Sequence, residues 1–237
     1  ADAAYLRKTN PQYTDLRISP TASLYWQLSP RWELTARAQF QQKNEEVTAY
    51  YPYSYWQNYR TMVSFSSHVP ELQDQLYSFY LTYKRTIHEF FWSLSGSYWN
   101  RKKPQLVHSE YQDSIFTLTT WEIPNRTRSY SLNSLLSKGF YDWNLKTSLE
   151  TQLLQSEGKQ AGQGSIQNYR YTQLTFTPKI NWAPFPWFSA TYLGFFTCNR
   201  SLIGEGNNLP ALWDIRQRIY LEIGNSTYQV RLSGEHY

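Results

Sequence analysis

The chain has 237 residues, a formal net charge of +5, and an aromatic content of 18%. Intrinsic disorder is excluded, because disordered chains combine few aromatic residues with a high net charge. The single cysteine, Cys198, rules out a disulfide framework. The charge is modest and dispersed, so no nucleic-acid partner is expected. No apolar run reaches the roughly 18 residues that a transmembrane helix needs.

Residues 15–41 alternate between apolar and polar side chains. The apolar parity consists of Leu16, Ile18, Pro20, Ala22, Leu24, Trp26, Leu28, Trp32, Leu34, Ala36, Ala38 and Phe40. Successive side chains of a β-strand point to opposite faces, so this pattern predicts two strands, each with one apolar and one polar face. The turn between them is expected at residues 29–31, where proline is tolerated.

The same alternation recurs in four further segments: residues 77–98, 130–152, 174–196 and 215–235. The chain is therefore predicted to form ten strands in five hairpins. Long connections are expected between the hairpins, at residues 43–75, 101–127, 155–167 and 197–212. Tight turns at one end and long loops at the other are typical of outer-membrane β-barrels. The predicted fold class is all-β, an antiparallel transmembrane β-barrel.

The two faces differ in the side chains that they carry. The polar parity mixes long charged groups with small hydroxyls, both of which a water-filled or plugged lumen accepts. Aromatic residues stand near the strand ends of the apolar parity, at Trp32, Tyr83, Trp143, Trp182 and Tyr228. Such rings are expected at lipid headgroups, with the apolar face toward lipid. The alternative is a soluble binding barrel, in which the apolar face fills the core.

Tyr237 indicates that the barrel is larger than ten strands. Bacterial barrels usually end on an aromatic residue of the lipid face, but Tyr237 shares the polar parity with Glu235 and Arg231. The last strand is therefore expected to continue beyond Tyr237, with strands missing at one or both ends. The alternative is a self-contained ten-stranded barrel, which can close because its strand number is even.

Four stretches of the chain are similar to the C-terminal part of a TonB-dependent outer-membrane receptor of the Bacteroidetes type. They are residues 16–40, 77–104, 125–150 with its SKGF turn, and 209–234. The resemblance implies a barrel of roughly 22 strands, a plug domain, and coupling to the TonB system. Residues 1–237 would then be a single barrel segment without the plug. The implied function is uptake of an unidentified nutrient across the Gram-negative outer membrane, without enzymatic activity or a cofactor. A passive porin is the alternative.

The loop at residues 49–60 is the predicted ligand-binding site. Its aromatic rings offer a large contact area at small entropic cost. The candidate residues are Tyr50, Tyr51, Tyr53, Tyr55, Trp56, Tyr59 and Arg60. The alternative is that these rings pack on one another and merely order the loop.

Charged residues supply two further candidates. The predicted lumen-facing arginines, which a plug domain would contact, are Arg17, Arg37, Arg216, Arg218 and Arg231. Alternatively, they pair with Asp15, Glu33, Glu222 and Glu235 on neighbouring strands. The cluster of Arg101, Lys102 and Lys103 would meet outer-membrane lipopolysaccharide or an anionic ligand, or is a solvated loop.

The four histidines share no ligand spacing, so no metal site is expected. His68 and His108 fall in predicted loops near Glu71, Asp74, Glu110 and Asp113. Acidic and histidine side chains at an outer mouth are the groups that an outer-membrane protease needs for acid–base chemistry. A protease is therefore kept as a minor alternative to a receptor.

Overall fold

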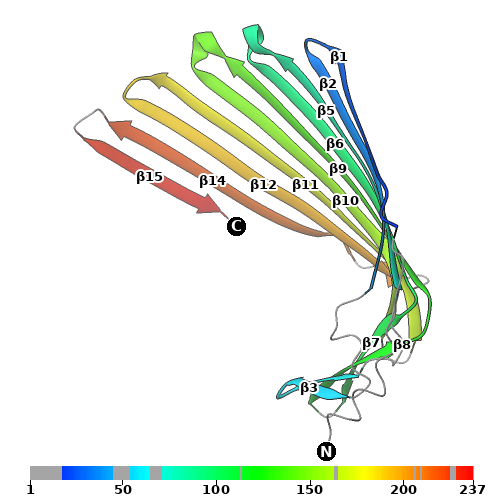
Figure 1. Cartoon of the computed structure of the whole chain (residues 1–237). Coiled ribbons are helices and arrows are strands. Elements are labelled where there is room, and N and C mark those ends of the chain that lie inside the picture. Colours follow the sequence, from blue (N-terminus) through cyan, green and yellow to red (C-terminus); the bar gives the residue numbers. More distant parts are fainter. Residues whose placement is uncertain are drawn as a thin grey trace, which may run out of the picture.

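The computed structural model describes residues 18–44, 54–64, 71–112, 114–162, 165–204, 207–208, 210–224 and 228–236. The predicted all-β, antiparallel architecture is confirmed (Figure 1). Within these residues the helical segments are two single 3-10 turns, η2 (Thr86–His88) and η3 (Tyr141–Trp143). No helix in the described part of the chain is long and apolar enough to cross a membrane.

Ten long strands lie side by side in chain order, and each pairs with its sequence neighbour in an antiparallel ladder. They are β1 (Thr21–Ser29), β2 (Trp32–Asn44), β5 (Glu71–Arg85), β6 (Phe90–Lys103), β9 (Asn125–Phe140), β10 (Leu145–Gly162), β11 (Ser165–Phe185), β12 (Phe188–Ile203), β14 (Leu212–Gly224) and β15 (Gln229–His236). Period-two alternation predicts this order because each tight turn returns the chain beside the strand that it has just left.

Three of the predicted loops contain short strands, so the described residues form a sheet of fifteen strands, the ten long ones and five additional short ones. The additional strands are β3 (Tyr55–Asn58), β4 (Thr61–Ser64), β7 (Leu106–Gln112), β8 (Ile115–Trp121) and β13 (Asn207–Asn208). Strand β4 pairs with β8 in parallel, and β7 pairs with β10 in parallel. The remaining predicted loop, residues 155–167, is wrong, because β10 and β11 stay paired as far as Gly162 and Ser165.

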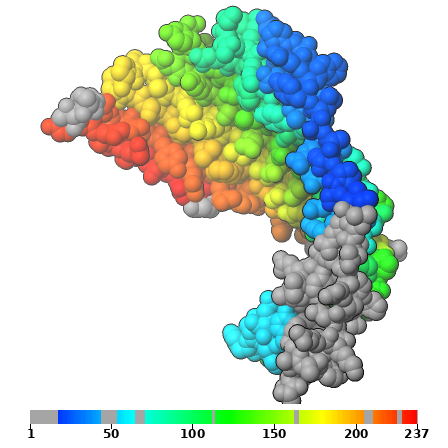
Figure 2. All heavy atoms as spheres, in the orientation of Figure 1, coloured from blue at the N-terminus to red at the C-terminus, as the bar shows by residue number. Residues whose placement is uncertain are grey.

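The sheet is curved but not closed. Among the described residues β1 pairs with β2 alone, and β15 pairs with β14 alone. The space-filling view shows these strands as one curved wall (Figure 2). The described residues therefore form an open sheet, and the alternative of a self-contained ten-stranded barrel would need a pairing of β1 with β15. Tyr237, on which the larger barrel was predicted, lies outside the described residues.

The register gives the sheet an apolar face and a polar face. A cross-strand row on the apolar face contains Leu24, Ala36, Phe79, Gly96, Leu132, Leu153, Leu174 and Cys198. A row on the polar face contains Thr35, Tyr80, Ser95, Asn133, Gln152, Thr175, Thr197 and Asp214. Pairing at fixed register therefore extends the alternation of single strands across the whole sheet.

The long sheet has no hydrophobic core of its own. The buried hydrophobic residues of the described chain are Val63, Leu72, Leu106 and Ala161, all at the end that carries the short strands. On the apolar face, by contrast, Leu24 is 53% exposed, Leu132 is 42% exposed and Ile219 is 50% exposed. Apolar area left in water makes no contribution to folding, so this face is a large apolar surface that the described residues leave uncovered.

Gly96 accommodates the ring of its cross-strand partner Phe79. A Cβ at position 96 would lie 2.4 Å from Phe79 Cε1. Gly96→Ala is therefore expected to lower the free energy of unfolding by about 1–2 kcal/mol through overpacking. In a Phe79→Ala background the same change should be neutral or stabilising, because alanine restricts the unfolded chain more than glycine does. Urea unfolding of the two single variants and the double variant measures this coupling.

Gly234 supplies the matched control, since a Cβ there would meet no atom within 4 Å. Gly234→Ala should not lower the stability. Equal destabilisation by Gly96→Ala with and without the Phe79 ring would contradict the proposed packing.

Candidate functional site

Aromatic side chains mark the apolar face near the tight turns. Trp32 lies 4.7 Å from Tyr83 and 5.8 Å from Trp92 between ring centroids, and the three residues share one cross-strand row. Two other predicted aromatic positions at this end are largely open, with Trp143 64% and Trp182 44% exposed. The clustering of aromatic residues at strand ends is therefore retained in three dimensions.

A second aromatic row, which was not predicted from the sequence, lies toward the other end of the same face. Tyr77, Tyr98 and Tyr130 occupy one row, with centroid distances of 6.1 Å and 4.9 Å between neighbours. We call these residues the tyrosine row. From Tyr130 to Phe140 strand β9 rises about 33 Å at roughly 3.3 Å per residue. A tilt of about 40° reduces this to roughly 25 Å, the height of the apolar band in membrane barrels.

Beyond the tyrosine row the same face becomes polar. The amide of Asn100, 1% exposed, donates to Gln75 Oε1 at 2.7 Å and accepts from Arg126 Nε at 2.6 Å. Farther along this region Glu157 lies between two arginines, 3.2 Å from Arg128 and 3.4 Å from Arg170. Because these residues come from neighbouring strands, cross-strand pairing fixes their relative positions.

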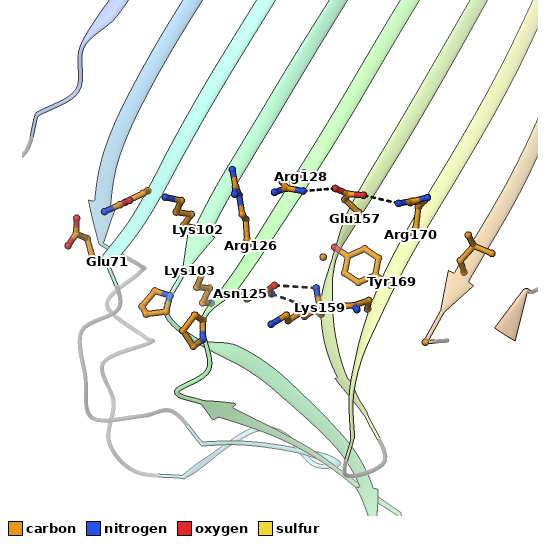
Figure 3. A pocket seen from close by; sticks show the side chains of 17 residues that line it. Glu71, Lys102, Lys103, Asn125, Arg126, Arg128, Glu157, Lys159, Tyr169 and Arg170 are labelled. Atoms are coloured by element: carbon orange, nitrogen blue, oxygen red, sulfur yellow. Dashed lines mark hydrogen bonds and ion pairs between the residues drawn. The ribbon is translucent and has the colours of Figure 1, made fainter. Parts of the chain in front are cut away.

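Arg126, Arg128, Glu157 and Arg170 line a groove of about 830 Å³ (Figure 3). We call it the basic groove, because six cationic side chains and only two carboxylates line it. The cationic residues are Lys102, Lys103, Arg126, Arg128, Lys159 and Arg170, and the acidic ones are Glu71 and Glu157. Figure 3 shows Arg128, Glu157 and Arg170 aligned across three strands. The predicted Arg-Lys-Lys cluster is therefore divided, because Lys102 and Lys103 line the groove and Arg101 does not.

Arg101 belongs to an ion-pair cluster on the polar face. Its Nε and Nη2 donate to the two carboxylate oxygens of Asp74 at 2.7 and 2.9 Å, and Lys43 Nζ lies 3.1 Å from Asp74 Oδ2. Asp74 precedes the tyrosine row along β5, so it lies outside the stretch between the tyrosine row and the tight turns. Burial acts to raise the pKa of Asp74, but the hydrogen bonds and charges of Arg101 and Lys43 outweigh it and lower the pKa.

The predicted lumen-facing arginines lie on the polar face where they are described. Arg218 pairs with Glu235 at 3.0 Å and Arg231 with Glu222 at 3.1 Å, as the cross-strand alternative predicts. Arg216 instead pairs with Asp214 of its own strand at 3.3 Å. Arg37 lines a hollow of about 280 Å³ together with small hydroxyl residues of β5, β6 and β9. Arg17 lies outside the described residues.

The predicted aromatic binding loop is described in part. Tyr55, Trp56, Tyr59 and Arg60 lie on or beside the β3–β4 hairpin, whereas Tyr50, Tyr51 and Tyr53 lie outside the described residues. Trp56 is 56% exposed and Tyr59 is 84% exposed, with the Arg60 guanidinium 5.2 Å from the Tyr59 ring. These side chains are open to a ligand, and their role in binding stays a prediction.

The histidine and acidic residues of the protease alternative do not form an open site where they are described. His108 is buried and stacks on Trp121 at 4.2 Å, and its Nε2 lies 3.8 Å from Glu110 Oε2. Asp74 forms ion pairs with Arg101 and Lys43. His68 and Asp113 lie outside the described residues. No group of three metal-ligating side chains is found in the described ranges.

The basic groove is not evident from the sequence, because its cations come from four long strands, β6, β9, β10 and β11. Each of these strands contributes only one or two of the cations, and the cross-strand register brings them together. A prediction that β10 and β11 stay paired beyond residue 155 would have placed these cations beside one another. No protein-family model matches the chain, and no curated protein or solved structure shows significant similarity to it.

Proposed function

We propose that the chain forms part of the wall of an outer-membrane β-barrel, with its apolar face in contact with lipid. The observation that carries this proposal is the long single-layered sheet, which has an uncovered apolar face and no hydrophobic core of its own. A soluble protein would have to cover this face, because contiguous apolar surface of this extent is rare in water. Lipid acyl chains cover it without a second protein layer.

Two further features support the proposed contact between the apolar face and lipid. The interval from Tyr130 to Phe140 matches the height of a membrane barrel's apolar band, and aromatic residues stand at both of its ends. The polar face carries hydroxyls and paired charges, as a water-filled or plugged lumen would. Among the described residues β1 and β15 each lack a partner on one side, and further strands would complete these edges, since an open sheet edge is not tolerated in lipid.

Within this class we propose a nutrient-uptake receptor of the TonB-dependent kind, as the sequence resemblance implies. The exposed β3–β4 hairpin would capture a nutrient at the surface through Trp56 and Tyr59. The polar face would then border the path through the lumen, where Arg37 and its neighbours would meet a plug domain. Positioning and passage suffice for transport, so no covalent chemistry is assigned to this chain.

Site-specific quenching tests whether lipid contacts the apolar face. Leu136 and Ser137 are adjacent on β9 and face opposite sides of the sheet. Each is replaced by cysteine in a Cys198→Ser background, labelled with a fluorophore, and reconstituted in vesicles that contain nitroxide-labelled lipid. Strong quenching is expected at position 136 and weak quenching at position 137. Equal quenching at both positions, or the reverse order, would refute the proposal.

A further inference from the structure

The basic groove continues the apolar face rather than the polar face. Lys102 pairs in register with Gln73 and Arg126, and Arg128 pairs with Asn100 and Glu157. Along β9, Arg128 stands two positions from Tyr130 and therefore points to the same side of the sheet as the tyrosine row. A molecule lying along the apolar face would thus reach the groove at its polar end.

The charges of the groove are unbalanced. Glu157 alone serves both Arg128 and Arg170, so one carboxylate faces two guanidinium groups. Within the described residues the ammonium groups of Lys102 and Lys159 have no ion-pair partner, and both line the groove. The groove therefore has an excess of positive charge that an anionic ligand would neutralise.

The guanidinium groups are also held in place before any ligand binds. Arg126 is oriented by Asn100, and Arg128 and Arg170 are oriented by Glu157. A guanidinium presents paired N–H donors that match the oxygen atoms of a phosphate, and fixing it in advance reduces the entropic cost of binding. The arrangement is suited to phosphate groups.

We propose that the basic groove binds the phosphates of a membrane glycolipid. The acyl chains of this lipid lie along the tyrosine row and along the leucines between that row and the tight turns. This inference rests on the proposed function, because it requires lipid on the apolar face. A lipid explains the groove better than free phosphate does, because the groove opens directly onto the apolar face. Aromatic and leucine side chains beside it would contact acyl chains.

Native mass spectrometry of the purified protein with lipid A as the probe tests this assignment. The groove variant, Lys102→Gln with Lys159→Gln, removes the two ammonium groups that have no ion pair among the described residues. Each lysine near anionic lipid contributes about fivefold in affinity, so the dissociation constant should rise about 30-fold. The matched control, Lys146→Gln with Lys179→Gln, makes the same charge change on the polar face of β10 and β11 and should leave binding unchanged.

Two further probes distinguish the source of the phosphate. Dephosphorylated lipid A should bind the unchanged protein about as weakly as lipid A binds the groove variant. Millimolar inorganic phosphate should fail to displace lipid A. The assignment is overturned if the groove variant keeps full affinity, if dephosphorylated lipid A binds as tightly, or if inorganic phosphate competes effectively. Quenching at position 136 is read separately, so strong quenching without phosphate discrimination refutes only the groove assignment.

Discussion

Leu136→Arg is expected to lower the free energy of unfolding from vesicles by about 2–4 kcal/mol, because it places a charge near the midplane of the bilayer. Leu136 lies on the apolar face between Trp92 and Leu149 and is 40% exposed. It is also close to the middle of the interval from Tyr130 to Phe140. Urea titration of the protein folded into lipid vesicles, monitored by tryptophan fluorescence, measures the change.

Two control variants place the arginine at a different depth or on the other face of the sheet. Tyr130→Arg stands at the edge of the proposed band and should cost less than about 1 kcal/mol, since the penalty falls toward the interface. Asn133→Arg projects from the polar face into the hollow beside Ser95 and should have a similarly small effect. A protein-covered apolar face predicts no dependence on depth. Equal losses at positions 130 and 136 would therefore contradict contact with lipid.

Sequence alternation predicts the long sheet well because apolar and polar side chains alternate along each strand and so lie on opposite faces of the sheet. Leu132, Leu136 and their neighbours on β9 are apolar at every second or fourth position, which places them together whatever the exact register. Lys138 also lies on this face, near the tight turn, where it donates to the backbone carbonyl of His88. A lysine near the band edge can extend toward water, so it does not break the pattern.

The strand ends could not be predicted in the same way. Residues 155–162 show no apolar alternation, yet they continue β10 because every residue has a backbone partner on β11. Their stability comes from ladder hydrogen bonds and from pairs such as Glu157 with Arg170, which leave no hydrophobic period in the sequence. Because these strand ends were not predicted, the basic groove that they help to form was not predicted either. Lys102 and Lys159 line the same groove only because β6, β9 and β10 keep register with one another.

Loss of the Asp74 carboxylate is expected to have the second large effect on stability. Asp74→Ala removes the acceptor of two Arg101 hydrogen bonds and the partner of Lys43, leaving both cations uncompensated beside each other. Breaking a fully buried pair costs about 3–5 kcal/mol, and the partial exposure of Arg101 reduces the expected loss to about 2 kcal/mol. Glu150→Ala, an exposed carboxylate on β10, should change stability by less than about 0.5 kcal/mol.

The pH dependence separates this charge effect from simple loss of packing. Because the pKa of Asp74 is lowered in the folded protein, its contribution to stability is complete above its ordinary pKa of 3.8 and is lost as the pH falls through the folded value. Asp74→Asn keeps the size of the side chain but cannot ionise, so it should abolish this part of the acid dependence. The measurement is urea unfolding of the protein and both variants between neutral pH and about pH 3. If the asparagine variant loses stability in acid as steeply as the unchanged protein, the cations do not stabilise the Asp74 carboxylate.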